Sequence, residues 1–252
     1  MTDNVLKEAY RNLAATWKAL PDPVRTSLID EFVLGYAFNS GHIENDQITF
    51  HDTREVFEHG RVVSFTGDVR TLFEIQNLKT SWVWGQELAV PELLFDEATV
   101  LRAHALLTQG TYDEHRWEQG ERPGTYKVSE YVVGVHGIGA PAAEVPAQMR
   151  ELLDEVNDAM GDESNALTVA AYLHAGIVDI HPFADGNGRV ARLLMNMALL
   201  AMGQPPIVIR EQDRIAYYGA LDAFHEESDL TPFRDFLRGE SLVTWKSLVR
   251  TV

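Results

Sequence analysis

Residues 181–192 read HPFADGNGRVAR and separate two strongly apolar segments. Gly186, Asn187 and Gly188 tolerate positive φ, so the backbone can curl its amide groups inward at this point. The segment that follows, to about Met202, is apolar almost all round, as expected for a helix at the centre of a bundle. The segment before it has one apolar helical face. The stretch therefore predicts a glycine-rich turn between two core helices.

Helical patterns also dominate the rest of the chain. The exception is the run from Tyr126 to Val133, which is rich in β-branched and aromatic residues and predicts a short hairpin between Gly124 and His136. We therefore expect an all-α fold, a helical bundle with one short β-hairpin. No repeat or flexible linker divides the chain, so we expect a single domain over 1–252. Within it we expect an N-terminal helical region at about 22–46, a core at about 95–205, and C-terminal helices at 206–252.

Composition narrows the functional classes. The 252 residues carry a formal charge of −17 and are 45% apolar. Such an acidic surface repels phosphate backbones and anionic membranes, so we expect neither nucleic acid nor a membrane as a partner. The absence of cysteine excludes disulfides and thiolate-metal sites. The N-terminus has no signal-peptide core and no apolar stretch is long enough to span a bilayer, so we expect a cytoplasmic, bacterial protein.

The first helical turn after the glycines holds Arg189 and Arg192 rather than acidic residues. Two cations at the positive end of a helix are unfavourable by roughly 0.3–1 kcal/mol each, and a bound polyphosphate would reverse that sign. His181 is a suitable proton acceptor beside such an anion site, and Asp185 a suitable Mg²⁺ ligand. The alternative is a glycine-rich turn whose arginines pair with surface carboxylates.

HPFADGNGRVAR resembles the signature of Fic-domain proteins, His-Pro-Phe-x-[Asp/Glu]-Gly-Asn-[Gly/Lys]-Arg-x-x-Arg, at every fixed position. The resemblance extends over roughly 35–240. It implies a Fic-fold bundle that transfers AMP from ATP to a Tyr, Ser or Thr hydroxyl of a target protein, or of itself, and releases pyrophosphate. A relative with Lys at the place of Gly188 and Ala at that of Gly186 phosphorylates instead, so this chain has the nucleotidyl-transfer form.

The same resemblance implies the site residues and the cofactor. These are His181 as general base, Asp185 as the Mg²⁺ ligand, Gly186, Asn187, Gly188 and Arg189 against the α- and β-phosphates of ATP, and Arg192 against the γ-phosphate. Tyr126, Lys127, Val128 and Ser129 are similar in placement to the family's flap, which docks the target protein. Tyr217 and Tyr218 are candidates for an adenine pocket, although two tyrosines on a helix are more often core residues.

Ser40, Glu44 and Asn45 resemble the family's inhibitory motif, [Ser/Thr]-x-x-x-Glu-[Gly/Asn]. Ser40 and Glu44 are one helical turn apart, and Asn45 is a candidate left-handed C-cap. The resemblance implies that Glu44 pairs with Arg192 and blocks the γ-phosphate position. Without it, the motif is a helix end with an exposed glutamate.

Other functions stay open at this stage. Within the family they are removal of AMP, with Glu44 activating a water, and transfer of UMP or phosphocholine. A metal-dependent phosphohydrolase would use His174, His181, Asp179 and Asp185. A non-catalytic module would use the fold only to dock peptides. Oligomeric state is also open, with a homo-oligomer among the alternatives.

Overall fold

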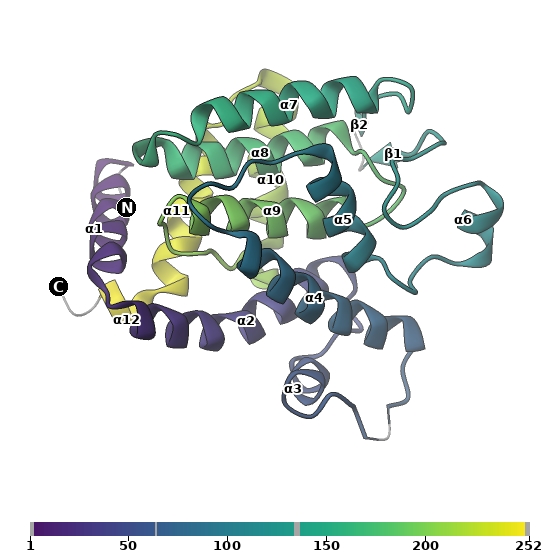
Figure 1. Cartoon of the computed structure of the whole chain (residues 1–252), viewed down its shortest axis with the longest axis horizontal. Coiled ribbons are helices and arrows are strands. Elements are labelled where there is room, and N and C mark those ends of the chain that lie inside the picture. Colours follow the sequence, from purple (N-terminus) through teal and green to yellow (C-terminus); the bar gives the residue numbers. More distant parts are fainter. Residues whose placement is uncertain (1–2, 64, 134–136, 250–252) are drawn as a thin grey trace.

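The computed structural model describes residues 3–63, 65–133 and 137–249, and its fold is predominantly helical (Figure 1). The first half contains α1 (Asp3–Ala19), α2 (Asp22–Glu44), α3 (Phe50–His59), α4 (Val69–Leu88), α5 (Glu97–Leu107) and α6 (Glu114–Glu118). The second half contains α7 (Val145–Ala159), α8 (Ala166–Ile180), α9 (Asn187–Ala201), α10 (Arg214–Glu227), α11 (Thr231–Thr244) and α12 (Lys246–Val249). The all-α prediction is confirmed.

The pair α8 and α9 forms the centre of the bundle. The two helices pack along each other, with α7 and α11 against α8 and with α2, α4 and α5 against α9 (Figure 1). Residues on every side of α9 are buried, including Val190, Leu193, Met195 and Leu199. Each such side chain contributes roughly 1.5–3 kcal/mol on burial. The loop between α8 and α9 is therefore held at both ends by the most deeply packed helices of the chain.

An aromatic cluster fixes the N-terminal half of α2. Phe32 lies 5.1 Å from Trp82 of α4 and 5.7 Å from Trp245, which follows α11, between ring centroids. Trp245 in turn lies 4.7 Å from Trp17 of α1. Tyr36 packs 4.8 Å from the same Trp82. These contacts join α1, α2, α4 and the C-terminal helices into one core, and α1 and α12 pack against each other at one side of the molecule (Figure 1).

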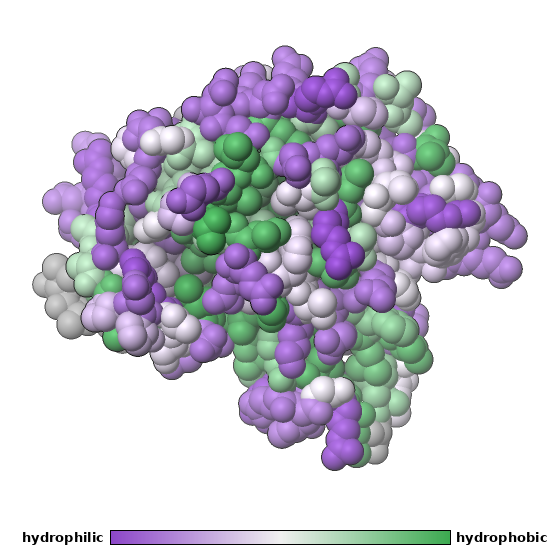
Figure 2. All heavy atoms as spheres, in the orientation of Figure 1, coloured by the Kyte–Doolittle hydropathy of each residue, from purple (hydrophilic) through white to green (hydrophobic). Residues whose placement is uncertain are grey.

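A smaller apolar cluster supports the segment between α2 and α4. It consists of Ile48, Val56 and Ile75, and α3 projects from the main body of the bundle (Figure 1). On the face of the molecule shown in Figure 2, apolar side chains gather over the middle and hydrophilic ones over the rim. No helix in the described part of the chain combines the length and the apolar character that crossing a membrane requires.

The predicted hairpin is wrong in position and extent. The structure has β1 (Val132–Val133) paired antiparallel with β2 (Gly137–Ile138), and the residues between them lie outside the described part of the chain. The segment from Tyr126 to Tyr131 forms no strand. Its amide groups are used locally, because the N–H of Lys127 donates to the carbonyl of Pro182 and those of Val128 and Ser129 donate to the Glu121 carboxylate.

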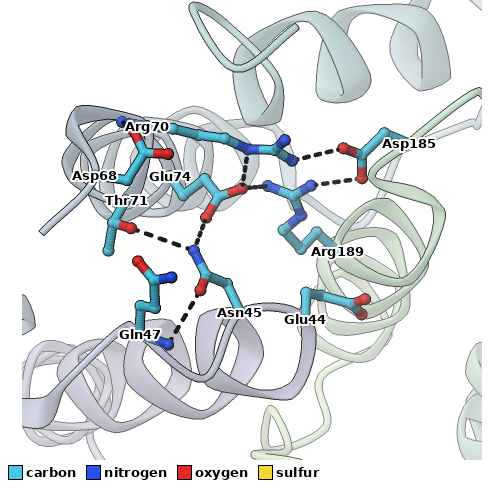
Figure 3. Close-up of a pocket in the computed structure, with 9 residues that line it drawn as sticks. All are labelled: Glu44, Asn45, Gln47, Asp68, Arg70, Thr71, Glu74, Asp185 and Arg189. Carbon is cyan, nitrogen blue, oxygen red and sulfur yellow. Dashed lines mark hydrogen bonds and ion pairs between the residues drawn. The ribbon is translucent and has the colours of Figure 1, made fainter. Parts of the chain in front are cut away.

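The start of α4 is set by a helix cap. The Asp68 side chain accepts a hydrogen bond from the Arg70 N–H, and the helix begins at Val69. This start places Arg70 in the first turn of α4, facing the loop before α9 (Figure 3). The single-domain organisation stays a prediction.

Candidate functional site

His181 ends α8 in an unusual conformation. Its φ of 51° and ψ of 60° are left-handed, a region that residues other than glycine enter at a cost of roughly 1–3 kcal/mol. The turn is held from both sides, because the His181 N–H donates to the Ile177 carbonyl and the Ile180 carbonyl accepts from the N–H of Ala140. Gly139 approaches so closely that a Cβ there would collide with His181. The strained backbone is thus fixed by its surroundings.

The imidazole of His181 is neutral at pH 7. Burial, followed by the charge of Lys127, lowers its pKa to about 4. Lys127 is itself only 3% exposed, and its ammonium has no hydrogen-bond partner among the described residues. A neutral imidazole can accept a proton, so its protonation state suits the role of a general base.

The glycine turn is rigid and leaves the start of α9 open. Gly186 has a φ of 85°, and a Cβ there would also meet the Thr108 methyl group, so only glycine fits. The Asn187 side chain spans the loop, accepting from the Phe183 N–H at 2.9 Å and donating to the Phe183 carbonyl at 2.8 Å. The side chain of Asn187 therefore shapes the loop. The first backbone N–H groups of α9 stay available to an anion, because no preceding helical turn supplies carbonyl groups to accept from them.

Arg192 of α9 is 1% exposed and bound by α2. Its Nη2 donates to Glu44 Oε1 at 2.7 Å and to the Ser40 carbonyl at 3.0 Å, and its Nε donates to Ser40 Oγ at 2.9 Å. Glu44 Oε1 also lies directly over Gly188, where a Cβ would collide with it. The structure thus brings Arg192 together with Ser40 and Glu44, which lie 152 and 148 residues before it in the sequence.

Asp185 is surrounded by three guanidinium groups. Its carboxylate lies 2.8 Å from Arg70 Nη2, 3.0 Å from Arg189 Nη2 and 3.5 Å from Arg116 Nη2. Burial alone would raise the pKa of Asp185, but Arg189, Arg70 and Arg116 outweigh it and hold the pKa below its usual value. The carboxylate is therefore ionised at neutral pH. Arg70 and Arg116 lie outside the sequence motif and were not predicted.

His104 of α5 is a second residue that the sequence did not reveal. Its ring stacks on Phe183 with centroids 3.8 Å apart. Nδ1 accepts from the Gly124 N–H at 2.9 Å, so Nε2 carries the proton and lies 3.1 Å from the Asp185 carbonyl. Burial lowers the pKa of His104 to about 3. His104 thus joins the loop before α9 to the segment around Gly124, and no local sequence pattern indicates contacts over such separations.

The left-handed C-cap predicted at Asn45 is wrong. Asn45 is extended, with φ of −139° and ψ of 103°. This backbone directs its side chain to α4, where Nδ2 donates to Glu74 Oε2 at 2.7 Å and lies 3.3 Å from Thr71 Oγ1 (Figure 3). The carbonyl oxygen of the same side chain accepts from the Gln47 N–H. The amide thus replaces the expected backbone cap with contacts to another helix.

A cavity of about 320 Å³ lies between the end of α2, the start of α4 and the loop before α9. Glu44 and Arg189 border it on the loop side, and Arg70 and Glu74 border it on the α4 side (Figure 3). Its other lining residues are Asn45, Gln47, Asp68, Thr71 and Asp185. Ionised groups of both signs dominate the cavity wall.

The two tyrosines of α10 differ in environment. The hydroxyl of Tyr217 is buried, 3.1 Å from His174 Nε2 and 3.4 Å from Arg192 Nη1. Tyr218 is 38% exposed, and Arg214 lies over its ring. Tyr218 is therefore the more accessible of the two, although Arg214 and Tyr217 both lie against its ring.

The residues of the alternative metal site do not gather. His174 is bound to Tyr217, and Asp179 pairs with His225 on α10. Within residues 3–63, 65–133 and 137–249, no group of three or more His, Cys, Asp or Glu side chains is arranged to hold a metal ion. The described residues therefore do not form the dinuclear set of a phosphohydrolase.

Comparison with known proteins points to one family. The profile of the Fic/DOC family matches residues 94–199. Protein adenylyltransferase Fic of Drosophila willistoni is 28% identical over 206 residues, which cover 80% of this chain and 39% of that protein. The protein of the same name from Drosophila grimshawi is also 28% identical over 206 residues, which cover 80% of this chain and 40% of that protein. The chain thus spans about two fifths of the length of the curated relatives it matches.

Two solved structures share the fold over nearly the whole chain. A Fic domain-containing signalling protein of Bacteroides thetaiotaomicron superposes with a TM-score of 0.81 at 24% identity, covering 97% of this chain and 95% of that one. Fic-1 (residues 134–508) of C. elegans superposes with a TM-score of 0.82 at 23% identity, covering 99% of this chain and 72% of that one. These likenesses show that the chain has the fold of these Fic-domain structures, and the Fic/DOC family profile matches the part of it that contains the 181–192 loop.

Proposed function

We propose that this protein transfers AMP from ATP to a hydroxyl side chain of a target protein, and that Glu44 restrains the reaction. The observation that carries the proposal is the start of α9. Two arginines and open amide groups lie there, close in sequence to a neutral His181, and the first turn of the helix has no acidic residue. Such a helix start favours a polyphosphate. The relatives named protein adenylyltransferase support the same reaction class.

His181 acts as the general base in this proposal. Its neutral imidazole takes the proton of the acceptor hydroxyl, whose oxygen attacks the α-phosphorus. One phosphorus–oxygen bond forms to the acceptor, and the bond from the α-phosphorus to its bridging oxygen breaks. AMP stays on the target and pyrophosphate leaves. The amide groups at 186–189 and the Arg189 and Arg192 side chains stabilise the charge on the phosphates.

The residues present suit Mg²⁺ carried in with the nucleotide. Mg²⁺ is commonly held by one or two carboxylates together with substrate phosphates and water. Asp185 supplies one ionised carboxylate at the cavity wall. The metal would neutralise phosphate charge there. Arg70 and Arg189 neutralise this carboxylate in the absence of a ligand.

Glu44 restrains the reaction by occupying Arg192. A carboxylate at this place repels the γ-phosphate and holds the guanidinium that should bind it. The pKa of Arg192 is raised, because the attraction of Glu44 outweighs the effect of burial. Removal of the Glu44 side chain leaves Arg192 charged, so the variant should bind ATP in the productive orientation.

The target protein is proposed to dock along residues 126–129, before β1. Val128 is exposed and faces outward, whereas Tyr126 packs against Phe183 and Lys127 is buried. Because the Glu121 carboxylate already holds the amide groups of Val128 and Ser129, the target strand would have to pair with the carbonyl groups of the segment and contact the exposed Val128 side chain. The protein is its own test substrate, through self-modification.

The test is transfer of label from α-labelled ATP, compared between the parent chain and Glu44→Gly. We expect labelling to rise at least tenfold in Glu44→Gly and to disappear in Glu44→Gly with His181→Ala. Gln47→Ala, at the same cavity but without a side-chain role in the Arg192 contacts, is the matched control and should label like the parent. Mass spectrometry of the product, with UTP and CDP-choline in parallel reactions, identifies the transferred group.

Removal of AMP is the second candidate. The Glu44 side chain is one third exposed, so it can meet water while its Oε1 lies over Gly188. A synthetic AMP-modified peptide would lose AMP in the parent and keep it in Glu44→Gly if Glu44 activates water. A chain that shows neither transfer nor removal in any of these variants would be a peptide-docking module instead.

A further inference from the structure

Glu74 of α4 connects the end of α2 to the catalytic loop. Its Oε2 accepts from Asn45 at 2.7 Å, and its Oε1 accepts from Arg70 Nε at 3.0 Å and lies 3.6 Å from Arg189 Nη1. Both arginines then reach Asp185, as the dashed lines in Figure 3 show. A continuous set of contacts therefore runs from the inhibitory motif to the loop through one carboxylate.

The burial of this group makes its partners indispensable. Glu74 is 3% exposed and Arg189 2% exposed. A buried charge is tolerated only when it is paired and hydrogen-bonded, and removing one partner leaves the other uncompensated. Glu74 compensates Arg70 and Arg189 with one oxygen and satisfies Asn45 with the other. A neutral glutamine can accept on one of these sides and must present its amide hydrogens to the other.

Two separate ties hold the last turn of α2. Glu44 reaches across to Arg192 on α9, whereas the next residue, Asn45, turns out of the helix and reaches Glu74 on α4. The extended backbone of Asn45 is what sends the two neighbouring side chains to different helices. Loss of the Glu44 contact therefore leaves the Asn45 contact intact.

We propose that Glu74 is a positioning residue shared by both parts of the site: it docks the end of α2 through Asn45 and fixes Arg189, Arg70 and, through them, Asp185 in the loop. The inference rests on the proposed function, since it assigns a second tie to the inhibitory segment. It predicts that Glu44→Gly removes the carboxylate from Arg192 while Ser40 keeps its contacts with that guanidinium, so that α2 stays docked. Undocking of the residues around Asn45 requires the loss of Asn45 or Glu74.

Amide hydrogen exchange of the whole chain, measured without nucleotide, tests this directly. We expect exchange over 41–48 to rise about tenfold in Asn45→Ala and in Glu74→Gln, as for the loss of one hydrogen bond to a charged group. It should rise less than threefold in Glu44→Gly and in the control Gln47→Ala. Exchange over 185–190 should rise in Glu74→Gln and in Arg70→Gln, and stay within twofold of the parent in Asn45→Ala. Exchange over 167–173 of α8 reports global destabilisation and should not change.

Self-labelling adds a readout that a purely structural role would not move. Asn45→Ala leaves Arg192 and its partners in place, so a rise of about threefold or more over the parent means that the second tie restrains the enzyme. The inference is overturned if Asn45→Ala leaves exchange over 41–48 unchanged, or if Glu74→Gln loosens only one of the two segments. Should Glu74→Gln not fold, Asn45→Ala and Arg70→Gln test the two sides separately. If no variant transfers label, Glu44→Gly included, the proposed function fails, while the exchange pattern still decides the role of Glu74.

Discussion

Gly188 lies under the Glu44 carboxylate in the first turn of α9. A Cβ there would collide with Glu44 Oε1 and lie 3.0 Å from Arg192 Nη1. In a helix without such neighbours, alanine is more stable than glycine by roughly 1 kcal/mol. We therefore expect Gly188→Ala to lower the free energy of unfolding by about 1–2 kcal/mol in the parent, because the buried contact is displaced. In the Glu44→Gly background the same substitution should raise it by about 0.5–1 kcal/mol.

The change of sign between the two backgrounds is the decisive quantity, and urea denaturation of the four proteins measures it as a coupling energy. Gly35 of α2 supplies the control, since a Cβ there meets nothing within 4 Å. Gly35→Ala should stabilise both backgrounds equally. Equal effects of Gly188→Ala in both backgrounds would show that Glu44 does not lie over the loop in solution.

At the scale of single residues, the sequence predicts the site residues within the 181–192 motif and misses those that reach it from other helices. His181, Asp185, Gly186 and Arg192 were identifiable because twelve consecutive residues carry the whole pattern. Glu74 and His104 were not, because the contacts of Glu74 with Asn45 and of His104 with Asp185 span 29 and 81 residues, and each residue sits on an ordinary helical pattern. The conformation of Asn45 was wrong because the competing contact with α4 has no local signal.

At the scale of elements, one buried carboxylate, that of Glu121, binds three groups of the segment 128–131. Glu121 Oε1 accepts from the Val128 N–H at 3.0 Å, from the Ser129 N–H at 3.2 Å and from the Tyr131 hydroxyl at 2.9 Å. Glu121→Ala removes the single oxygen that accepts all three hydrogen bonds. We expect amide exchange over 127–131 to rise about tenfold, while helices α8 and α9 stay protected.

Glu118→Ala, at an exposed position on α6, is the matched control for this change. Under the proposed function, the loosened flap should also raise the KM for a protein or peptide acceptor and leave the affinity for ATP within about twofold. If exchange over 127–131 stays at the parent level, another contact holds the flap.

The same contacts explain why the hairpin prediction was wrong. The run from Tyr126 to Val133 has the composition of a strand, yet strand propensity mainly reports how well side chains pack on a half-buried surface. Here the N–H groups of Lys127 and Val128 donate to Pro182 and Glu121, so they are not available to pair with another strand. The apolar helices were predicted correctly because their periodicity is long and their burial overrides local detail, as in α9.

Buried neutral histidines determine how the whole molecule responds to acid. Burial lowers the pKa of His181 to about 4 and that of His104 to about 3, and it lowers the pKa of His174 as well. Each imidazole is protonated near pH 6.5 in the unfolded chain but stays neutral in the folded one, so unfolding takes up protons below this pH. The free energy of unfolding should therefore fall as pH drops from 6.5 towards 4, with a limiting slope of about 4 kcal/mol per pH unit for three protons.

Urea denaturation at pH 7, 6 and 5 measures the slope. His181→Asn, which keeps a residue tolerant of the left-handed conformation, should reduce the limiting slope by about one proton. The exposed His51→Gln should leave it unchanged. A stability that is flat between pH 7 and 5 would mean that these imidazoles are not neutral and buried in the folded state.

The aromatic cluster around Phe32 makes tryptophan fluorescence a reporter on the position of α2. Trp17, Trp82 and Trp245 all lie within it, whereas α2 ends at Glu44, two to three helical turns further along the chain. Departure of the entire helix would expose indole rings to water and shift their emission to longer wavelengths. Fraying confined to the final turn would leave the emission colour as it was. Intrinsic tryptophan fluorescence, with no attached dye, can thus tell whether activation frays only the last turn of α2 or displaces the whole helix.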